Sequence, residues 1–181
     1  MSETAPRIAP GGLREIGLPI WVFSRLAGRV TRSTPPRIFT TLGRHRRLFW
    51  GWLHFAGRLM PGGRLPRVDS ELVILRVAAV RDSDYEFGHH SVLGRRAGLS
   101  TADIERVRLG SAAAGWTDRQ SLLLRAAESL LETRDLDDTL WSELRHDLDE
   151  RRCIELLMLV GHYDMLATTL HTLRVQPEAR R

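Results

Sequence analysis

The sequence contains a single cysteine, Cys153, among its 181 residues. One thiol cannot form an internal disulfide. It also cannot supply the two thiols of dithiol peroxidase chemistry, in which one acts as a low-pKa thiolate and the other resolves it. Cys153 lies among Ile154, Leu156 and Leu157, which favours an inert, buried thiol over a reactive one. Dithiol chemistry within the chain is therefore excluded.

Lysine is absent, because all 27 basic residues are arginine, and the formal net charge is +5. A basic chain is a candidate for nucleic-acid binding. Here the arginines are dispersed with Asp and Glu between them, and only Arg44-His45-Arg46-Arg47 forms a dense patch. Such a patch is typical of a solvated face or a protein-partner surface. Nucleic acid is therefore not expected as a partner.

Long apolar runs are also missing from the sequence. No stretch approaches the roughly 18–20 apolar residues that span a bilayer. The N-terminus shows no basic flank followed by an apolar core, the pattern of a secretory signal. The chain is therefore expected to be soluble and cytoplasmic, with no membrane partner.

Alternation of apolar and polar residues with period two is missing over any useful length, so the pattern predicts an all-α fold. Prolines and glycines in residues 1–19 favour a flexible N-terminal arm. Residues 20–181 are predicted to form one domain. Helix-capping patterns occur at Ser100-x-x-Asp103, at Thr117-x-x-Gln120, and at Asp137 or Asp138. Helices are expected at residues 20–30, 38–60 with an interruption, 71–98 as a hairpin, 102–109, 117–131, 138–148 and 150–173.

The most informative stretch is residues 71–98, ELVILRVAAVRDSDYEFGHHSVLGRRAG. Its apolar first half breaks at RDSD and restarts, as a helical hairpin would. Ser83 and Glu86 form S-x-x-E, a capping-box pattern for the second helix. Glu86 and His90 then lie four residues apart on one helix face, with Glu71 expected opposite. Carboxylates and an imidazole held together in this way are suited to general acid/base chemistry.

The spacing E-(x11)-S-x-x-E-x-x-x-H, from Glu71 to His90, resembles the motif of the carboxymuconolactone decarboxylase and alkylhydroperoxidase-D-like (AhpD-like) superfamily. Redox-active members have E-(x11)-C-x-x-C-x-x-x-H, so Ser83 and Glu86 stand at the two cysteine positions. The run Tyr85-Glu86-Phe87-x-x-His90 is similar to a Y-E-W/F-x-x-H subgroup. The other residues that resemble this subgroup are Gly94, Gly98, Trp116, Trp141 and Gly161-His162-Tyr163-x-Met165. The resemblance implies an AhpD-like helical bundle that assembles as a homo-oligomer.

Each candidate catalytic residue also has a structural interpretation. His90 could be a surface histidine, and Glu86 could serve only the helix cap. Glu71 lies in an apolar run, and a buried carboxylate is costly unless it is paired, so Arg76 or His90 is expected as its partner. Arg76 is thus either the counter-ion of Glu71 or a ligand for a substrate carboxylate.

The remaining predicted substrate-binding residues are Tyr85, Ser83, His54 and Tyr163. His54 lies in an aromatic-rich helix, where a core or rim histidine is the competing interpretation. Four aromatic residues crowd the same segment: Phe49, Trp50, Trp52 and Phe55. Part of this surface, or the N-terminal arm, is expected to bury against another subunit.

A metal site is the main competing hypothesis. Glu86-x-x-x-His90 is an acceptable ligand pair, which Glu71, His162 or His171 could complete. The spacing lacks the signature of a zinc or di-iron motif, so neither a metal nor another cofactor is expected.

The leading hypothesis is a cofactor-independent acid/base enzyme that resembles carboxymuconolactone decarboxylases. Its substrate would be a small carboxylate-bearing organic acid or lactone, and the reaction a decarboxylation or an isomerisation. His90 would transfer the proton, Glu71 would orient or polarise the His90 ring, and Glu86 would share the proton. The alternative is a non-catalytic ligand-binding or scaffold member of the superfamily.

Overall fold

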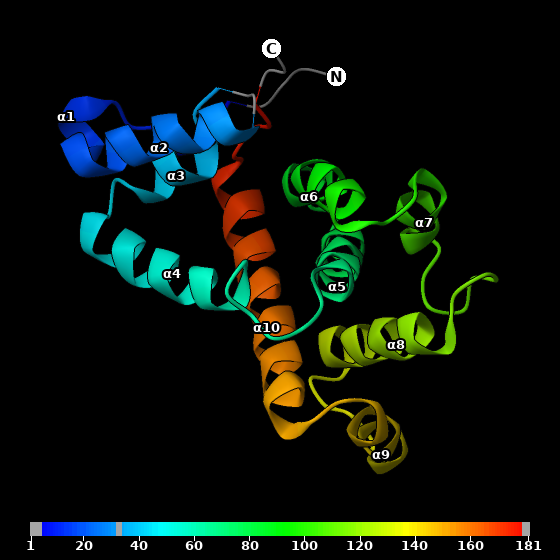
Figure 1. Cartoon of the computed structure of the whole chain (residues 1–181). Coiled ribbons are helices and arrows are strands. Elements are labelled where there is room, and N and C mark those ends of the chain that lie inside the picture. The colour runs from blue at the N-terminus through cyan, green and yellow to red at the C-terminus, as the bar shows by residue number, and fades with distance from the viewer. Residues whose placement is uncertain (1–4, 32–33, 179–181) are drawn as a thin grey trace. The chain divides into compact units, whose positions relative to one another are not determined.

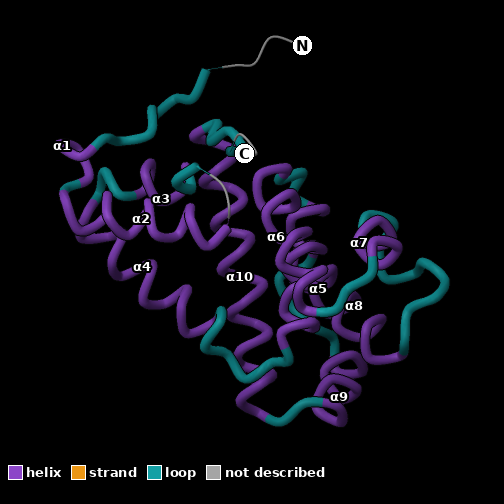
Figure 2. Tube along the Cα trace, turned by 45° about the horizontal axis from the view of Figure 1, so that its top comes forward, coloured by secondary structure: helices purple, strands orange, loops and turns teal. Residues whose placement is uncertain are grey.

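The computed structural model describes residues 5–31 and 34–178, and every regular element in these ranges is an α-helix (Figures 1 and 2). The predicted all-α class is confirmed. The helices are α1 (Leu13–Ile16), α2 (Leu18–Thr31), α3 (Arg37–Leu42), α4 (Arg46–Leu59), α5 (Arg67–Val80), α6 (Asp84–Ala97), α7 (Thr101–Val107), α8 (Asp118–Glu132), α9 (Asp138–Asp147) and α10 (Glu150–Leu173).

The chain divides into two compact units: the first unit comprises residues 1–56 with 169–181, and the second unit comprises residues 57–168. Both α4 and α10 contain a boundary between these units. The division therefore does not by itself separate two domains, and the single domain over residues 20–181 stays a prediction.

In the first unit an aromatic cluster forms the core. Ile16, Ile20 and Phe49 are almost completely buried. The Phe39 ring lies with its centroid 5.2 Å from that of Phe23 and 6.0 Å from that of Trp52. The aromatic crowding seen in the sequence is thus explained largely by packing inside this unit.

The predicted N-terminal arm contributes to the same unit. The Arg7 backbone N–H donates to the Leu173 carbonyl (3.0 Å), and the Gly11 N–H donates to the Thr40 carbonyl (2.9 Å). Residues 1–4 lie outside the described part of the chain. The predicted flexibility of the arm stays a prediction.

In the second unit α5 is the central helix, and it packs against α6, α7 and α8 (Figure 1). It is buried on nearly all sides, from Asp69 through Leu75 and again at Val77 and Ala78. A helix that is apolar all round is stable only when neighbours cover every face. The buried cluster around it consists of Leu72, Leu75, Ala78, Phe87, Leu99, Ile104, Val107 and Leu124.

The predicted caps of three helices are confirmed. Capping boxes formed by Ser100 with Asp103 and by Thr117 with Gln120 begin α7 and α8, and the Asp137 carboxylate accepts from the Leu140 N–H at the start of α9. The predicted box at the start of α6 is wrong, because the Ser83 side chain makes no capping hydrogen bond. The Ser83 backbone N–H donates instead to the Ala78 carbonyl (2.9 Å), which closes the turn after α5.

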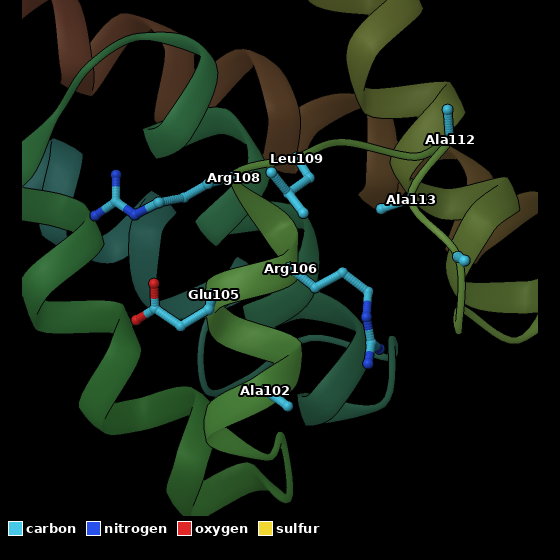
Figure 3. Close-up of a pocket in the computed structure, with 8 residues that line it drawn as sticks. Ala102, Glu105, Arg106, Arg108, Leu109, Ala112 and Ala113 are labelled. Carbon is cyan, nitrogen blue, oxygen red and sulfur yellow. The ribbon is translucent and has the colours of Figure 1, made fainter.

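A wide hollow lies beside α7 and the loop that follows it (Figure 3). Its volume is about 860 Å³. The residues that line it are Ala102, Glu105, Arg106, Arg108, Leu109, Ala112, Ala113 and Ala114. None of the predicted site residues is among them.

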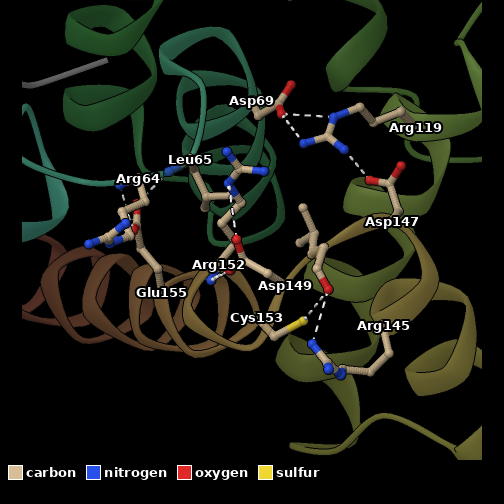
Figure 4. A network of polar contacts seen from close by, with 11 residues as sticks. Arg64, Leu65, Asp69, Arg119, Arg145, Asp147, Asp149, Arg152, Cys153 and Glu155 are labelled. Atoms are coloured by element: carbon tan, nitrogen blue, oxygen red, sulfur yellow. Dashed lines mark hydrogen bonds and ion pairs between the residues drawn. The ribbon is translucent and has the colours of Figure 1, made fainter.

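Polar contacts fix the start of α5 within the second unit (Figure 4). The Glu155 carboxylate on α10 accepts from the backbone N–H groups of Arg64 (2.6 Å) and Leu65 (3.0 Å), just before the helix. Asp69 in its first turn pairs with Arg119 of α8 (2.8 Å), which also pairs with Asp147 of α9. These contacts hold the first turn of α5 in place.

Helix α10 is long and apolar enough, by length and composition alone, to cross a membrane. The prediction that no segment approaches this limit is therefore wrong for α10. Half of its apolar window is buried inside the protein, as in the core helix of a globular unit. The buried face includes Cys153, which is 1% exposed, so the predicted buried thiol is confirmed.

Truncation of Leu75 to alanine should destabilise the protein by about 2–5 kcal/mol, because the residue is completely buried and leaves a cavity. The matched control is Leu109→Ala, since Leu109 is 76% exposed and its loss should change the free energy of unfolding by less than about 0.5 kcal/mol. Urea denaturation of both variants measures the difference. Equal effects would contradict the central position of α5.

Candidate active site

A buried carboxylate and a histidine meet where α5 packs on α6. Glu71 of α5 is completely buried, and its Oε2 lies 2.7 Å from Nδ1 of His90 on α6. His90 is 7% exposed, so the surface-histidine interpretation is wrong. Gly94 lies one helical turn after His90. A Cβ at Gly94 would lie 3.0 Å from Leu99 Cδ1 and 3.3 Å from Cδ1 of Leu75 on α5, so a larger residue at position 94 would require these side chains to shift.

The counter-ion of Glu71 is Arg67, a residue that the sequence reasoning missed. Arg67 Nη2 lies 2.9 Å from Glu71 Oε1, and the two residues are four apart on α5. The R-x-x-x-E spacing, which places both side chains on one helix face, was the signal available in the sequence. Oε1 of Glu71 thus contacts the Arg67 guanidinium, a permanent cation, and Oε2 contacts the His90 imidazole.

Arg76 occupies a different environment. Its Nε pairs with Glu128 of α8 (2.7 Å), and its Nη1 donates to the carbonyls of Val107 (2.9 Å) and Arg108 (3.3 Å). The hypothesis that Arg76 is the counter-ion of Glu71 is therefore wrong. Its role as a ligand for a substrate carboxylate stays a prediction, which these contacts do not favour.

Glu86 is buried without a counter-ion. It is 3% exposed, and neither of its carboxylate oxygens hydrogen-bonds to any residue in the described ranges. Burial raises the pKa of the Glu86 carboxyl to about 7, and the nearby Ser83 hydroxyl opposes part of that rise. Because the predicted capping box does not form, Glu86 does not serve the end of α6. It lies one turn before His90 on the same helix.

Two aromatic side chains of α10 complete the cluster. The Tyr163 ring packs edge-on against His90, with centroids 5.0 Å apart and planes at 88°, and similarly against His162 at 5.1 Å. Burial lowers the pKa of His162 to about 4, with a smaller contribution from His90. His162 is therefore neutral near pH 7.

The pKa of Tyr163 is also shifted by its surroundings. Burial raises the pKa of the Tyr163 phenol above its ordinary value. The negative charges of Glu71 and Glu86 raise it further, and the positive charge of Arg67 lowers it. The pKa of the Tyr163 phenol thus responds to the charges of Glu71, Glu86 and Arg67. The contact between Glu71 and His90 is observed, whereas the convergence of Glu86 with them around one cavity stays a prediction.

The structure gives no ligand contact for three other predicted substrate-binding residues, which are Ser83, Tyr85 and His54. Ser83 and Tyr85 are buried at the start of α6. His54 belongs to the first unit, where it is exposed on α4. The roles predicted for all three stay predictions.

No group of three or more His, Cys, Asp or Glu side chains among the described residues is arranged to hold a metal ion. His162, proposed as a further ligand, packs against Tyr163. His171 lies near the end of α10 and is exposed. Independence from metal stays a prediction.

The Glu71–His90 pair can organise proton transfer. An ionised Glu71, held by Arg67, favours the tautomer with the proton on His90 Nδ1. No described residue hydrogen-bonds to the other ring nitrogen, Nε2. That nitrogen can accept or return a proton. The Glu86 carboxyl, with its pKa of about 7, can also take up or release a proton near neutral pH.

Comparisons with known proteins bear on the family and the fold. Residues 46–129 match the carboxymuconolactone decarboxylase family model. No curated protein sequence matches the chain. Solved structures with the same fold include an AhpD core, an uncharacterised peroxidase-related protein of Ralstonia eutropha (16% identity, TM-score 0.86, covering 97% of this chain and 94% of that one).

A peroxidase-related protein of Silicibacter has 15% identity and a TM-score of 0.83, over 97% of this chain and 95% of that one. The debrominase Bmp8, solved with 2,3,4-tribromopyrrole, has 13% identity and a TM-score of 0.81, over 99% and 95%. At these identities the likeness shows the fold, and the predicted AhpD-like bundle is confirmed.

Replacement of Glu86 by glutamine should change how stability depends on pH. The folded pKa of about 7 exceeds the ordinary 4.5, so folding binds a proton between these values. The wild type is thus fully stabilised below pH 4.5 and loses that contribution as pH rises through 7. Glutamine does not titrate. The variant should therefore gain up to about 3 kcal/mol over the wild type between pH 4.5 and 7.5.

Urea unfolding of both proteins across this pH range measures the difference. His162 titrates in both proteins, so its contribution cancels. Parallel stability profiles would show that Glu86 is not held as a neutral group.

Proposed function

Because this chain belongs to the carboxymuconolactone decarboxylase and AhpD-like superfamily, we propose that it is an acid/base enzyme that needs no cofactor. Its substrate is a small carboxylate-bearing organic acid or lactone, and its reaction is a decarboxylation or an isomerisation. The observation that carries this proposal is the buried 2.7 Å contact between Glu71 and His90.

In the proposed reaction His90 Nε2 is the proton carrier. For isomerisation it removes a proton from carbon and returns it at another position. For decarboxylation the C–C bond to the carboxylate breaks, CO₂ leaves, and the electron pair left on carbon takes the proton. Glu71 is a positioning residue that holds the ring through Nδ1. Glu86 exchanges a proton with the substrate or with His90.

Peroxide reduction by a dithiol is not proposed. The two positions that carry cysteine in redox-active relatives hold Ser83 and Glu86, and Cys153 is buried with its Sγ 3.7 Å from the Leu148 carbonyl. Two of the structural neighbours are peroxidase-related proteins, and another is a debrominase with a bound bromopyrrole. The bromopyrrole complex supports a small organic molecule as the kind of ligand that this fold accommodates.

Replacement of His90 by alanine should lower kcat about 100-fold or more, because a positioned acid/base group contributes about 10²–10⁴. Glu71→Gln should lower kcat with little change in KM. A suitable assay uses a panel of β-keto acids and unsaturated lactone carboxylates, and it measures CO₂ release and deuterium incorporation by NMR. The matched control is His146→Ala, an exposed histidine of α9.

The assay is repeated after treatment with a chelator, and full activity is expected. Turnover that survives both His90→Ala and Glu71→Gln would contradict the proposal. A non-catalytic ligand-binding or scaffold protein would then be the better interpretation.

We also propose that the chain forms a homo-oligomer in the cytoplasm, without nucleic acid or membrane as partners. Exposed apolar residues on two helices support self-association. Leu48 and Trp50 on α4 are 63% and 43% exposed, and Ile154 and Met158 on α10 are 61% and 47% exposed. Ile154 and Met158 lie one turn apart on one face.

Light scattering at micromolar concentration should give a mass above that of one 20.6 kDa chain. Ile154→Arg should shift the mass toward the monomer if the exposed face of α10 is buried in the assembly, since an unpaired charge is costly at an apolar contact. A monomeric wild type would contradict the proposal.

A further inference from the structure

The outward face of α10 is a regular stripe of exposed residues. Between Arg151 and Leu170 the exposed residues recur at alternating intervals of three and four, and they are Arg151, Ile154, Met158, Gly161, Met165 and Thr168. This spacing places them along one side of the helix, as in a heptad repeat. All of them belong to the second unit. This surface is called the α10 stripe below.

The middle of the α10 stripe is apolar, whereas a solvated helix face is normally charged. On α8 every exposed residue is charged, and these residues are Asp118, Arg125 and Glu132. On α10, by contrast, Ile154, Met158 and Met165 are 61%, 47% and 52% exposed. Exposed apolar residues gathered on one face are typical of a surface that contacts another protein.

Gly161 leaves a gap in the α10 stripe between the side chains of Met158 and Met165. A Cβ at position 161 would meet no atom within 4 Å, so packing within the chain does not require a glycine there. A glycine inside a helix costs about 0.5–1 kcal/mol relative to alanine. The benefit of a missing side chain is that another segment can approach the helix closely at this point.

We infer that α10 packs antiparallel against α10 of a second copy of this chain, with Met158 of each copy placed over Gly161 of the partner subunit. This inference rests on the proposed homo-oligomer and specifies its contact surface and register. A two-fold contact uses the same surface on both copies. In this register Ile154 faces Met165 of the partner subunit, and the same pairs recur in reverse order.

The residues of the α10 stripe favour the antiparallel direction. In a parallel pair each residue would face its own counterpart, so Gly161 would face Gly161 of the partner subunit and leave a void. The two Arg151 guanidiniums would also meet and repel each other. In the antiparallel pair Met158 fills the gap, and Arg151 faces Thr168 of the partner subunit. Antiparallel helices also align their dipoles favourably.

The charges on α10 fit a second copy better than a strongly charged partner. From Ile154 to Thr168 no exposed residue carries a charge. Two half-buried carboxylates of the same helix are compensated within the chain. Asp164 pairs with Arg81 (2.6 Å), and Glu155 accepts hydrogen bonds from two backbone N–H groups of the loop before α5. An acidic or basic partner would therefore find no counter-charge on the apolar part of the stripe.

Single cysteines test the direction and register of this contact. The background is Cys153→Ser, which removes the one native thiol. Ile154→Cys and Met165→Cys are oxidised separately, and also after the two proteins are unfolded together and refolded. In the antiparallel pair, equal positions lie about 16 Å apart along the axis, too far for a disulfide. Neither variant should crosslink alone, whereas the mixture should yield a disulfide between positions 154 and 165, identified by mass spectrometry.

Replacement of Gly161 tests the close approach. Gly161→Leu has room within its own chain but occupies the place of Met158 of the partner subunit. Sedimentation velocity from about 0.1 to 100 µM should show self-association at least about tenfold weaker than in the wild type, with an unchanged circular dichroism spectrum. The matched control is Gly88→Leu, because Gly88 is exposed within α6 and a Cβ there also meets nothing within 4 Å. Its self-association should match that of the wild type.

Several outcomes would overturn the inference. Disulfides between equal positions in either cysteine variant alone would show a parallel pair. A mixture that does not crosslink, or unchanged self-association of Gly161→Leu, would show that α10 is not the contact. Binding of the wild type to phosphatidylglycerol vesicles, lost in Ile154→Arg, would assign the stripe to a membrane surface instead.

These outcomes are distinguishable from failure of the earlier proposals. If the wild type remains an oligomer in any of these cases, the proposed homo-oligomer survives and only its interface is wrong. A wild type that is monomeric at about 100 µM would reject the homo-oligomer together with this interface. The acid/base function is judged separately, by the sensitivity of turnover to His90→Ala.

Discussion

The buried charge of Glu71 is the constraint on which the second unit depends. Its side chain is completely shielded from solvent, and an uncompensated carboxylate there would cost several kcal/mol. Compensation comes from Arg67 one turn earlier on α5 and from His90 on α6. The second contact lies where α6 packs on α5, and a Cβ at Gly94 in the same region would lie 3.3 Å from Leu75 Cδ1 of α5. The packing of α6 on α5 and the orientation of the His90 ring are thus both tied to the ionised Glu71 side chain.

The sequence predicted the helices and the Glu71–His90 contact because both follow from periodicity and spacing. It offered His90 or Arg76 as the partner of Glu71, and His90 is observed in that role. Arg76 lies in the same apolar run, but a spacing of five residues places it on a different side of the helix from Glu71. The competing pairing with Glu128 is a contact between residues 52 positions apart, and no local pattern shows it. The capping box at Ser83 failed for a similar reason, since the turn already used the backbone N–H of Ser83.

Ser83 and Glu86 stand where the redox-active motif that this sequence resembles has two cysteines. A buried glutamate near neutrality gains and loses protons, whereas a thiol pair gains and loses electrons. The Glu71–His90 pair is compatible with either proton transfer or electron transfer by thiols, since the carboxylate holds the imidazole in one tautomer. The identity of residue 86 therefore distinguishes this chain from the redox-active motif that its sequence resembles.

Helix α10 carries two kinds of surface. Tyr163 is buried and its ring contacts His90, whereas Ile154, which lies roughly half a turn away around the helix axis, is exposed. A helix with its side chains is only about 10 Å across, and it moves as a stiff unit. Any sliding or rotation of α10 therefore carries the exposed face and the aromatic wall of the site together. Within this unit, the exposed face of α10 is mechanically coupled to the Tyr163–His90 contact.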